Sequence, residues 1–81
     1  MTNREKLRDL LLDVFLLQPA EFSFELCRAD VPTWDSLGLV SLGVGVEEVF
    51  GHHLAPEEIT SITGVPDLVA LLERRGVPFD D

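Results

Sequence analysis

Hydrophobic residues at the start of the chain recur at the spacing of an amphipathic helix. Five of them share one face when placed at about 100° per residue, namely Leu7, Leu10, Leu11, Val14 and Phe15. Leu12 and Leu16 widen this stripe. Gln18-Pro19 ends the pattern because a proline disfavours helical geometry in the residue before it. The spacing predicts a first helix over residues 3–17.

A second helix is predicted over residues 36–50. Asp35 is a favoured N-cap type, since its carboxylate can accept a hydrogen bond from the first turn and oppose the positive end of the helix dipole. No proline interrupts the stretch before Gly51, and Pro56 follows soon after. Ser36 therefore stands at the start of a capped helix.

This second helix has two apolar stripes where an ordinary surface helix has one. The inner stripe consists of Leu39, Leu42, Val46, Val49 and Phe50. The outer stripe, nearly opposite, consists of Leu37, Val40 and Val44 and is bordered by Glu47 and Glu48. Two interpretations follow. Either the helix is buried on both sides, or the outer stripe is a docking surface beside Ser36.

The stretch between these helices, residues 18–34, has no sustained period. It contains Pro19 and Pro32 and alternating Phe22 and Phe24, which predicts a long ordered loop held by aromatic side chains. Trp34 at its end is interpreted as part of the core.

Two shorter helices are predicted in the last third. Pro56 suits a first helical position and opens a short helix over residues 57–62, with Ile59 and Ile62 inward. A final helix over residues 66–75 turns four apolar residues inward, Leu68, Val69, Leu71 and Leu72, and Gly76 suits its C′ position. The predicted fold is all-α, a four-helix bundle with a short third helix and a long first loop.

Composition narrows the possible partners and location. Eighty-one residues make one small domain, and a net charge of −9 argues against nucleic acid or an anionic membrane. Basic protein partners are the natural complement. Asp9 and Asp13 interrupt the N-terminal apolar run, and no run is long enough to span a membrane, so a cytoplasmic location is expected. The protein is expected to be a monomer. The single cysteine, Cys27, fits a reducing compartment and is expected to be buried or half-buried.

No catalytic or metal constellation is recognisable, so the chain is not expected to be an enzyme. His52 and His53 lie at the far end of the helix that Ser36 opens, roughly 24 Å away, too far to activate that serine. Adjacent histidines point in different directions, and no further ligand follows at metal spacing, so no metal is expected. The glycines at 38, 43 and 45 match neither a P-loop nor a dinucleotide loop.

The stretch from Asp35 to Gly51 carries a resemblance. Asp35-Ser36-Leu37, followed by a helix that ends in Glu47-Glu48-Val49-Phe50-Gly51, resembles the acyl and peptidyl carrier proteins, and the match continues through residues 57–72. It implies an acyl-carrier type of bundle in which Ser36 receives a 4′-phosphopantetheine arm from coenzyme A. An acyl or aminoacyl group would then travel on the arm as a thioester.

The resemblance also implies partners. A phosphopantetheinyl transferase would load the arm, and an adenylating ligase, acyltransferase or ketosynthase with a basic surface would dock on Asp35, Leu37, Val40, Val44, Glu47 and Glu48. Thr33-Trp34-Asp35-Ser36-Leu37-Gly38 is similar to freestanding carriers of bacterial secondary metabolism, which favours polyketide or mixed polyketide-peptide biosynthesis. The alternative is an acidic helical adaptor with the carrier fold that is never modified.

Two features of the second helix bear on these hypotheses. A helix N-terminus suits a phosphodiester on Ser36, because unpaired N–H groups and the positive dipole end favour an anion. Gly43 and Gly45 each cost about 1 kcal/mol of helix propensity relative to alanine. They provide room for cargo, allow close helix approach, or reflect neutral drift.

Overall fold

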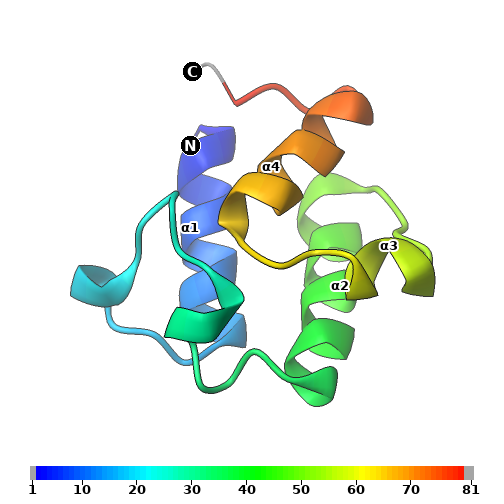
Figure 1. The fold of residues 1–81 in the computed structure, drawn as a ribbon. Helices are drawn as coiled ribbons and strands as arrows, with labels where there is room; N and C mark the ends of the chain where they lie inside the picture. The colour runs from blue at the N-terminus through cyan, green and yellow to red at the C-terminus, as the bar shows by residue number, and fades with distance from the viewer. Residues whose placement is uncertain (1, 80–81) are drawn as a thin grey trace.

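The computed structural model describes residues 2–79, and in this range it contains four α-helices and no strand (Figure 1). The helices are α1 (Asn3–Val14), α2 (Ser36–Phe50), α3 (Pro56–Thr60) and α4 (Val65–Arg74). Helices α1 and α2 run antiparallel and pack on each other, and α3 packs on α2. The predicted all-α bundle with a short third helix is confirmed.

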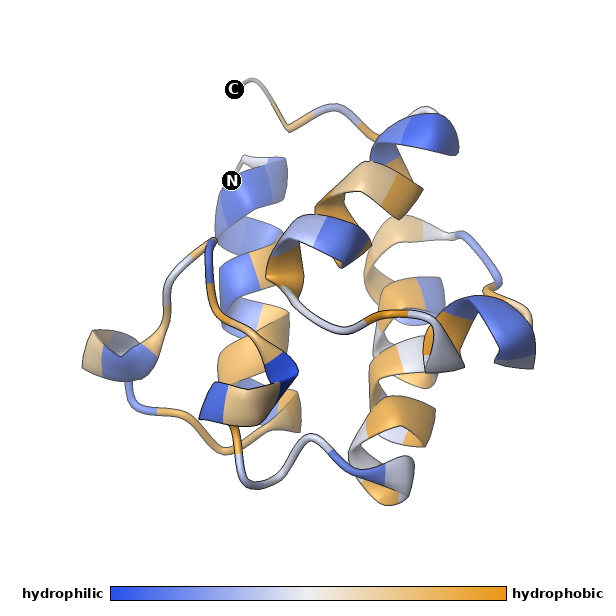
Figure 2. Ribbon diagram, viewed as in Figure 1, coloured by the Kyte–Doolittle hydropathy of each residue, from blue (hydrophilic) through white to orange (hydrophobic). Residues whose placement is uncertain are grey.

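One hydrophobic core joins all these elements except the short α3, which adds only the half-buried Ile59. Residues with almost no exposed surface come from both long helices and from α4, for example Leu7, Leu42 and Leu68. Figure 2 shows that α2 is hydrophobic over most of its length, whereas the first turns of α1 are polar. A helix with this much apolar surface needs either several partners inside the fold or a partner outside it.

Helix α1 ends at Val14, three residues before the expected end at Leu17. Phe15 is the C-cap, and Leu16 adopts the left-handed region with φ 56°. The Leu17 N–H then donates to the Leu12 carbonyl at 2.9 Å, the bond that closes a Schellman motif. Leu16 is 79% exposed, so the prediction that it widens the buried stripe is wrong.

Helix α2 has the predicted bounds. The Asp35 carboxylate accepts a hydrogen bond from the Gly38 N–H at 2.9 Å, and Gly51 ends the helix in the left-handed region with φ 73°. Of the inner stripe, three residues are buried, namely Leu39, Leu42 and Val46. Phe50 is half-buried against the Phe79 ring. Val49 is 41% exposed, so its assignment to the core is wrong.

The loop between α1 and α2 is packed against the bundle. It contains two 3₁₀ turns, η1 (Pro19–Glu21) and η2 (Arg28–Asp30). The rings of Phe22 and Phe24 meet edge to face at 5.0 Å, and the Arg4 guanidinium lies 5.0 Å from the centre of the Phe24 ring. The prediction of an ordered loop with aromatic anchors is confirmed.

A short antiparallel bridge ties this loop to the turn before α4. The Val65 N–H donates to the Leu26 carbonyl and the Arg28 N–H donates to the Thr63 carbonyl, both at 2.8 Å. Cys27 pairs with Gly64 in this bridge, and it is exposed. The expectation of a buried or half-buried thiol is therefore wrong, because the bridge fixes the backbone and leaves the side chain exposed.

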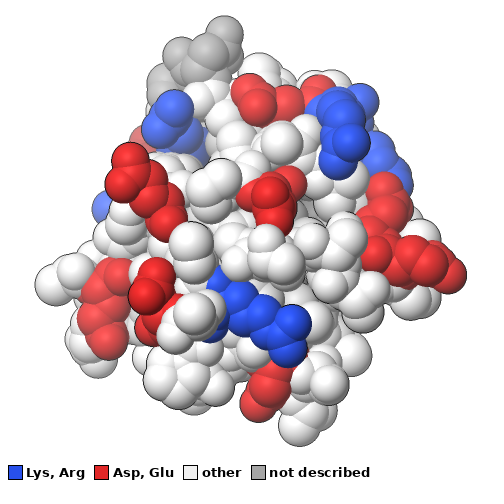
Figure 3. Space-filling view, viewed as in Figure 1, with Lys and Arg blue, Asp and Glu red and all other residues white. Residues whose placement is uncertain are grey.

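Helices α3 and α4 differ slightly from the predicted ranges 57–62 and 66–75. Helix α3 already ends at Thr60, and the buried Ile62 belongs to the turn that follows. Glu58 accepts a hydrogen bond from the Ala55 N–H at 2.9 Å and forms an ion pair with Arg75, which ties α3 to the end of α4. Figure 3 shows acidic side chains over α3 and basic ones over the end of α4.

The two ends of the described chain lie together (Figure 1). The Asn3 amide donates to the Pro78 carbonyl at 2.8 Å, and the Arg4 guanidinium donates to the Phe79 carbonyl at 2.7 Å. Phe79 is buried, with 3% of its surface exposed. No helix within residues 2–79 is long and apolar enough to cross a membrane.

Candidate functional site

Ser36 is the first residue of α2 and is exposed. Its hydroxyl makes no hydrogen bond to any other residue in the described range. Asp35 satisfies only one backbone donor of the first turn, that of Gly38, so further N–H groups at this helix start have no partner within the helix. The serine is thus a free hydroxyl beside the positive end of a fifteen-residue helix.

The chain that leads into Ser36 is held firmly. The Trp34 indole stacks on the Phe15 ring at 4.8 Å and is 3% exposed, which confirms its place in the core. The Thr33 hydroxyl donates to the Phe15 carbonyl at 2.7 Å. Both contacts fasten the end of the long loop to the end of α1, so the position of Ser36 is fixed relative to the bundle.

Gly38 belongs to this arrangement, a role that the hydrophobic pattern did not predict. A Cβ atom there would collide with the Thr33 carbonyl oxygen and would come 2.9 Å from a carbon of the Phe15 ring. Glycine is therefore the residue that lets the loop cross the first turn of α2. The available signal was a glycine in the first turn of a helix, where it has an energetic cost and needs a packing reason.

The outer stripe of α2 is exposed to solvent. Leu37, Val40 and Val44 have exposed fractions of 78%, 63% and 53%. The alternative in which α2 is buried on both sides is therefore wrong. Glu47 and Glu48 are exposed beside the stripe. Apolar side chains of this size, contiguous along a helix, form the kind of patch that marks an interaction surface.

The charges near the stripe are almost all negative. Helix α2 contains no lysine or arginine. The Glu47 carboxylate lies 3.4 Å from His53 Nδ1, an exposed contact that is an ion pair only when the histidine is protonated. His52 and His53 belong to no group of three or more potential metal ligands within residues 2–79.

Gly43 and Gly45 lie where α2 meets its neighbours. A Cβ at Gly43 would come 2.6 Å from Ile59 Cδ1 of α3, and one at Gly45 would collide with the Leu10 side chain of α1. Of the three explanations that the sequence left open, the structure supports close helix approach, because both positions are already filled by a neighbouring side chain.

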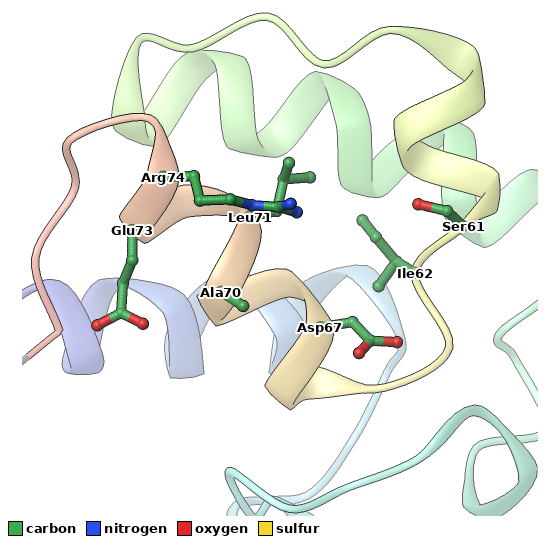
Figure 4. Close-up of a pocket in the computed structure, with 7 residues that line it drawn as sticks. All are labelled: Ser61, Ile62, Asp67, Ala70, Leu71, Glu73 and Arg74. Atoms are coloured by element: carbon green, nitrogen blue, oxygen red, sulfur yellow. The ribbon is translucent and has the colours of Figure 1, made fainter.

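A separate cleft lies between α4 and the turn that follows α3 (Figure 4). Ile62 and Leu71 form its apolar part, and polar groups surround them, including Asp67 and Arg74. The Thr63 hydroxyl and N–H both donate to the Asp67 carboxylate, which lowers the pKa of that carboxyl group. None of the residues that line this cleft belongs to α2, so it is distinct from the surface beside Ser36.

Comparison with known proteins agrees with this geometry. The chain is 32% identical over 69 residues to the acyl carrier protein of Coprothermobacter proteolyticus, covering 85% of this chain and 84% of that protein. It is 28% identical over 75 residues to the acyl carrier protein of Solidesulfovibrio magneticus, covering 93% and 96%, and 26% identical over 69 residues to acyl carrier protein 2 of Ralstonia nicotianae, covering 85% of each. No protein-family model matches the sequence.

Fold and surface define a small acidic helical domain with a free serine at the start of its central helix and an exposed apolar stripe. With this similarity over most of its length, the chain belongs to the acyl carrier protein family. Members of this family are carriers and not enzymes, and they hold a covalently attached 4′-phosphopantetheine group. They interact with a phosphopantetheinyl transferase and with biosynthetic enzymes.

The residues present fit this prosthetic group. A phosphodiester needs an accessible hydroxyl, and Ser36 supplies one with no competing hydrogen bond in the described chain. A phosphate also needs hydrogen-bond donors or positive potential, which the open first turn of α2 provides. Exposed Leu37 leaves the space beside the hydroxyl open to an enzyme.

Proposed function

We propose that Ser36 is the attachment site of the 4′-phosphopantetheine group and that the protein carries an acyl or aminoacyl intermediate on this arm. The observation that supports the assignment is the exposed, unbonded Ser36 hydroxyl at the capped start of α2. The arm supplies a terminal thiol, which holds the cargo as a thioester. The chain itself supplies the anchor and the docking surface.

Loading requires an enzyme in trans. The Ser36 oxygen would form a bond to the phosphorus that is joined to the pantetheine part of coenzyme A. The pyrophosphate linkage would break, and adenosine 3′,5′-bisphosphate would leave. The serine proton must go to a base, and both histidines lie beyond the other end of α2, so the transferase has to supply that base.

We propose further that partner enzymes dock on the outer stripe of α2. Leu37, Val40 and Val44 would form the apolar contact, and the charged rim would consist of Asp35, Glu47 and Glu48. Such a small patch suits a weak, transient complex, because a carrier must leave one enzyme for the next. Adenylating ligases, acyltransferases and ketosynthases with a basic surface are the proposed partners beside the transferase.

The proposed pathway is polyketide or mixed polyketide-peptide biosynthesis. It is supported by the residues that lead into the site, Val31-Pro32-Thr33-Trp34, where many fatty-acid carriers have Leu-Gly-Ala. Gly38 and Ser41 also stand where many fatty-acid carriers have acids. The docking surface is therefore less charged at its serine end and depends more on apolar contact.

The test is the intact mass of the protein after incubation with coenzyme A and a phosphopantetheinyl transferase. Wild type should gain one phosphopantetheinyl group and Ser36→Ala none. Ser41→Ala is the matched control, since Ser41 is an exposed serine further along the same helix, and it should gain one group. If wild type gains no group with several transferases, the unmodified adaptor becomes the better hypothesis.

A further inference from the structure

The outer stripe continues into a groove between α1 and α2, to which Val40 and Val44 also belong. Its floor is formed where Gly45 of α2 meets the Leu10 side chain of α1. Its walls are four valines, Val14 on α1 and Val40, Val44 and Val49 on α2. The hollow has a volume of about 820 Å³ and is open to solvent.

Val49 is exposed because it lines this groove, which is open to solvent. Helix α1 presents Lys6 and Asp9 along the same hollow, and these polar side chains line it without covering the valine. Val49 therefore continues the exposed surface of Val40 and Val44 around the helix toward α1. No residue in the described range closes the groove from outside.

The rim of the groove is acidic on both sides. Asp9 and Asp13 lie on the α1 side, and Glu48 lies on the α2 side. Asp9 forms an ion pair with Arg8 at 3.1 Å, whereas Asp13 and Glu48 have no ion pair or side-chain hydrogen bond within residues 2–79. Lys6 is the one basic residue among those lining the hollow.

We propose that this groove binds a basic amphipathic helix of a partner protein, with aliphatic side chains on the valines and lysines or arginines facing Asp13 and Glu48. An apolar floor between two acidic rims fits a helix of that pattern, which places anchors at every third or fourth position. A second copy of this chain fits poorly, because its net charge of −9 would bring acids against acids. The inference deepens the proposed function by adding α1 as a second wall to the docking surface.

The probe for the test is a synthetic helical peptide with leucines on one face and lysines elsewhere. It is titrated into isotope-labelled protein and followed by NMR, and a scrambled peptide of the same composition is the control for net charge. The full titration is repeated on Ser36→Ala, which cannot carry the arm if the proposed function is right. Binding that persists in this variant is independent of the serine assignment, so the two hypotheses fail separately.

We expect shift changes at Leu10, Val14 and Val49 and weaker binding of the scrambled peptide. Asp13→Lys should raise the Kd about fivefold, because it reverses a charge at the rim. The matched reversal Glu25→Lys, at an exposed acid in the long loop, should change the Kd less than about twofold.

Three results would overturn the proposal. One is the absence of binding, or equal binding of the scrambled peptide. Another is a set of shifts confined to the cleft between α4 and the turn that follows α3. The third is a dimer in sedimentation that dissociates in Val49→Ser, which would assign the groove to a second copy of the chain.

Discussion

At the scale of single residues, the departures from the helical pattern each have a local cause. Leu16 has the apolar character of its neighbours but adopts the left-handed region. Hydrophobic periodicity records which residues are apolar, and it contains no information about φ, so a helix end at a non-glycine residue is not visible in it. Cys27 is likewise exposed because a backbone bridge, and not its hydrophobicity, decides its position.

We predict that Leu16→Gly stabilises the protein. Glycine adopts the left-handed region without the steric cost of about 1 kcal/mol that leucine carries, and the exposed leucine side chain contributes little burial. The net gain should be a few tenths of a kcal/mol to about 1 kcal/mol, because glycine also increases the entropy of the unfolded chain. Chemical denaturation measures it, with Leu16→Ala as the control that should gain nothing comparable.

Alanine at two glycines of α2 should have different effects. Gly38→Ala must displace the Thr33 backbone and should cost about 1–3 kcal/mol, the range for overpacking. Gly43→Ala meets only the flexible end of Ile59, so the helix propensity gained, about 1 kcal/mol, should nearly offset the contact. Thermal unfolding compares them. Equal midpoints for the two variants would contradict the close packing of Thr33 on Gly38.

At the scale of elements, α2 decides both the fold and the site. Its bounds could be predicted because an N-cap aspartate, an uninterrupted apolar run and a glycine coincide with the ends that the structure shows. Its two apolar stripes also followed from the pattern, except that Val49 is exposed and does not belong to the inner one. Whether the outer stripe is buried was left open by the pattern, and the exposure of Leu37, Val40 and Val44 decides it. The sequence pattern could not predict which residues of α1 lie next to this helix. The contact between Gly45 and Leu10, for example, depends on how the two helices pack.

We predict that Val44→Asp slows cargo transfer by a partner enzyme more than Glu48→Gln does. Val44 is 53% exposed, so the substitution places a charge in the docking patch without burying it in the core. Circular dichroism and the thermal midpoint should hardly change. Added salt should slow transfer only modestly, as few charges are there to be screened. A large loss of helicity in Val44→Asp would show that the stripe supports the fold.

We predict that the N-cap and the charge of Asp35 can be separated. Asp35→Ala should cost about 1 kcal/mol of stability, because the Gly38 N–H loses its acceptor, whereas Asp35→Asn keeps an acceptor oxygen and should cost less. If Asp35 also contacts basic partners, both variants should slow docking by a similar factor. Urea denaturation and transfer rates, measured side by side, distinguish these two roles.

At the scale of the whole molecule, repulsion between negative charges opposes folding, and local hydrogen bonds to some of the carboxylates counteract that repulsion. A net charge of −9 on a small domain produces self-repulsion. Two of the carboxylates, those of Glu5 and Glu58, accept hydrogen bonds from backbone groups nearby in the sequence. The Thr2 and Ala55 N–H groups donate to Glu5 and Glu58, and these bonds are the main cause of the lowered pKa of each carboxyl group, with Arg75 adding to the effect at Glu58. Composition alone predicts the repulsion between the negative charges. It does not predict these hydrogen bonds, because they depend on the geometry of the helix caps.

We predict that stability declines as the pH falls below about 4.5, the ordinary pKa of a glutamate. Carboxyl groups whose pKa is lowered by folding stabilise the fold above their unfolded pKa, and this stabilisation is lost as the pH falls through the folded pKa. Glu58→Gln should therefore be less stable than wild type at pH 6, and the difference should shrink toward pH 3. Urea midpoints across this range measure it, with Glu57→Gln as the neighbouring control. A difference that stays constant with pH would contradict the role of the ionised Glu58.

The first and last described residues of the chain lie together, which determines the side from which the domain could be tethered. Asn3 and Arg4 clip the segment of Pro78 and Phe79, and this clip lies at the opposite end of the bundle from the start of α2 (Figure 1). The described ends of the chain therefore lie on one side of the domain, about the length of a fifteen-residue helix from Ser36. If the domain were tethered to a surface or to a neighbouring protein on that side, it could reorient about the tether, and Ser36 would lie on the side facing away from the anchor.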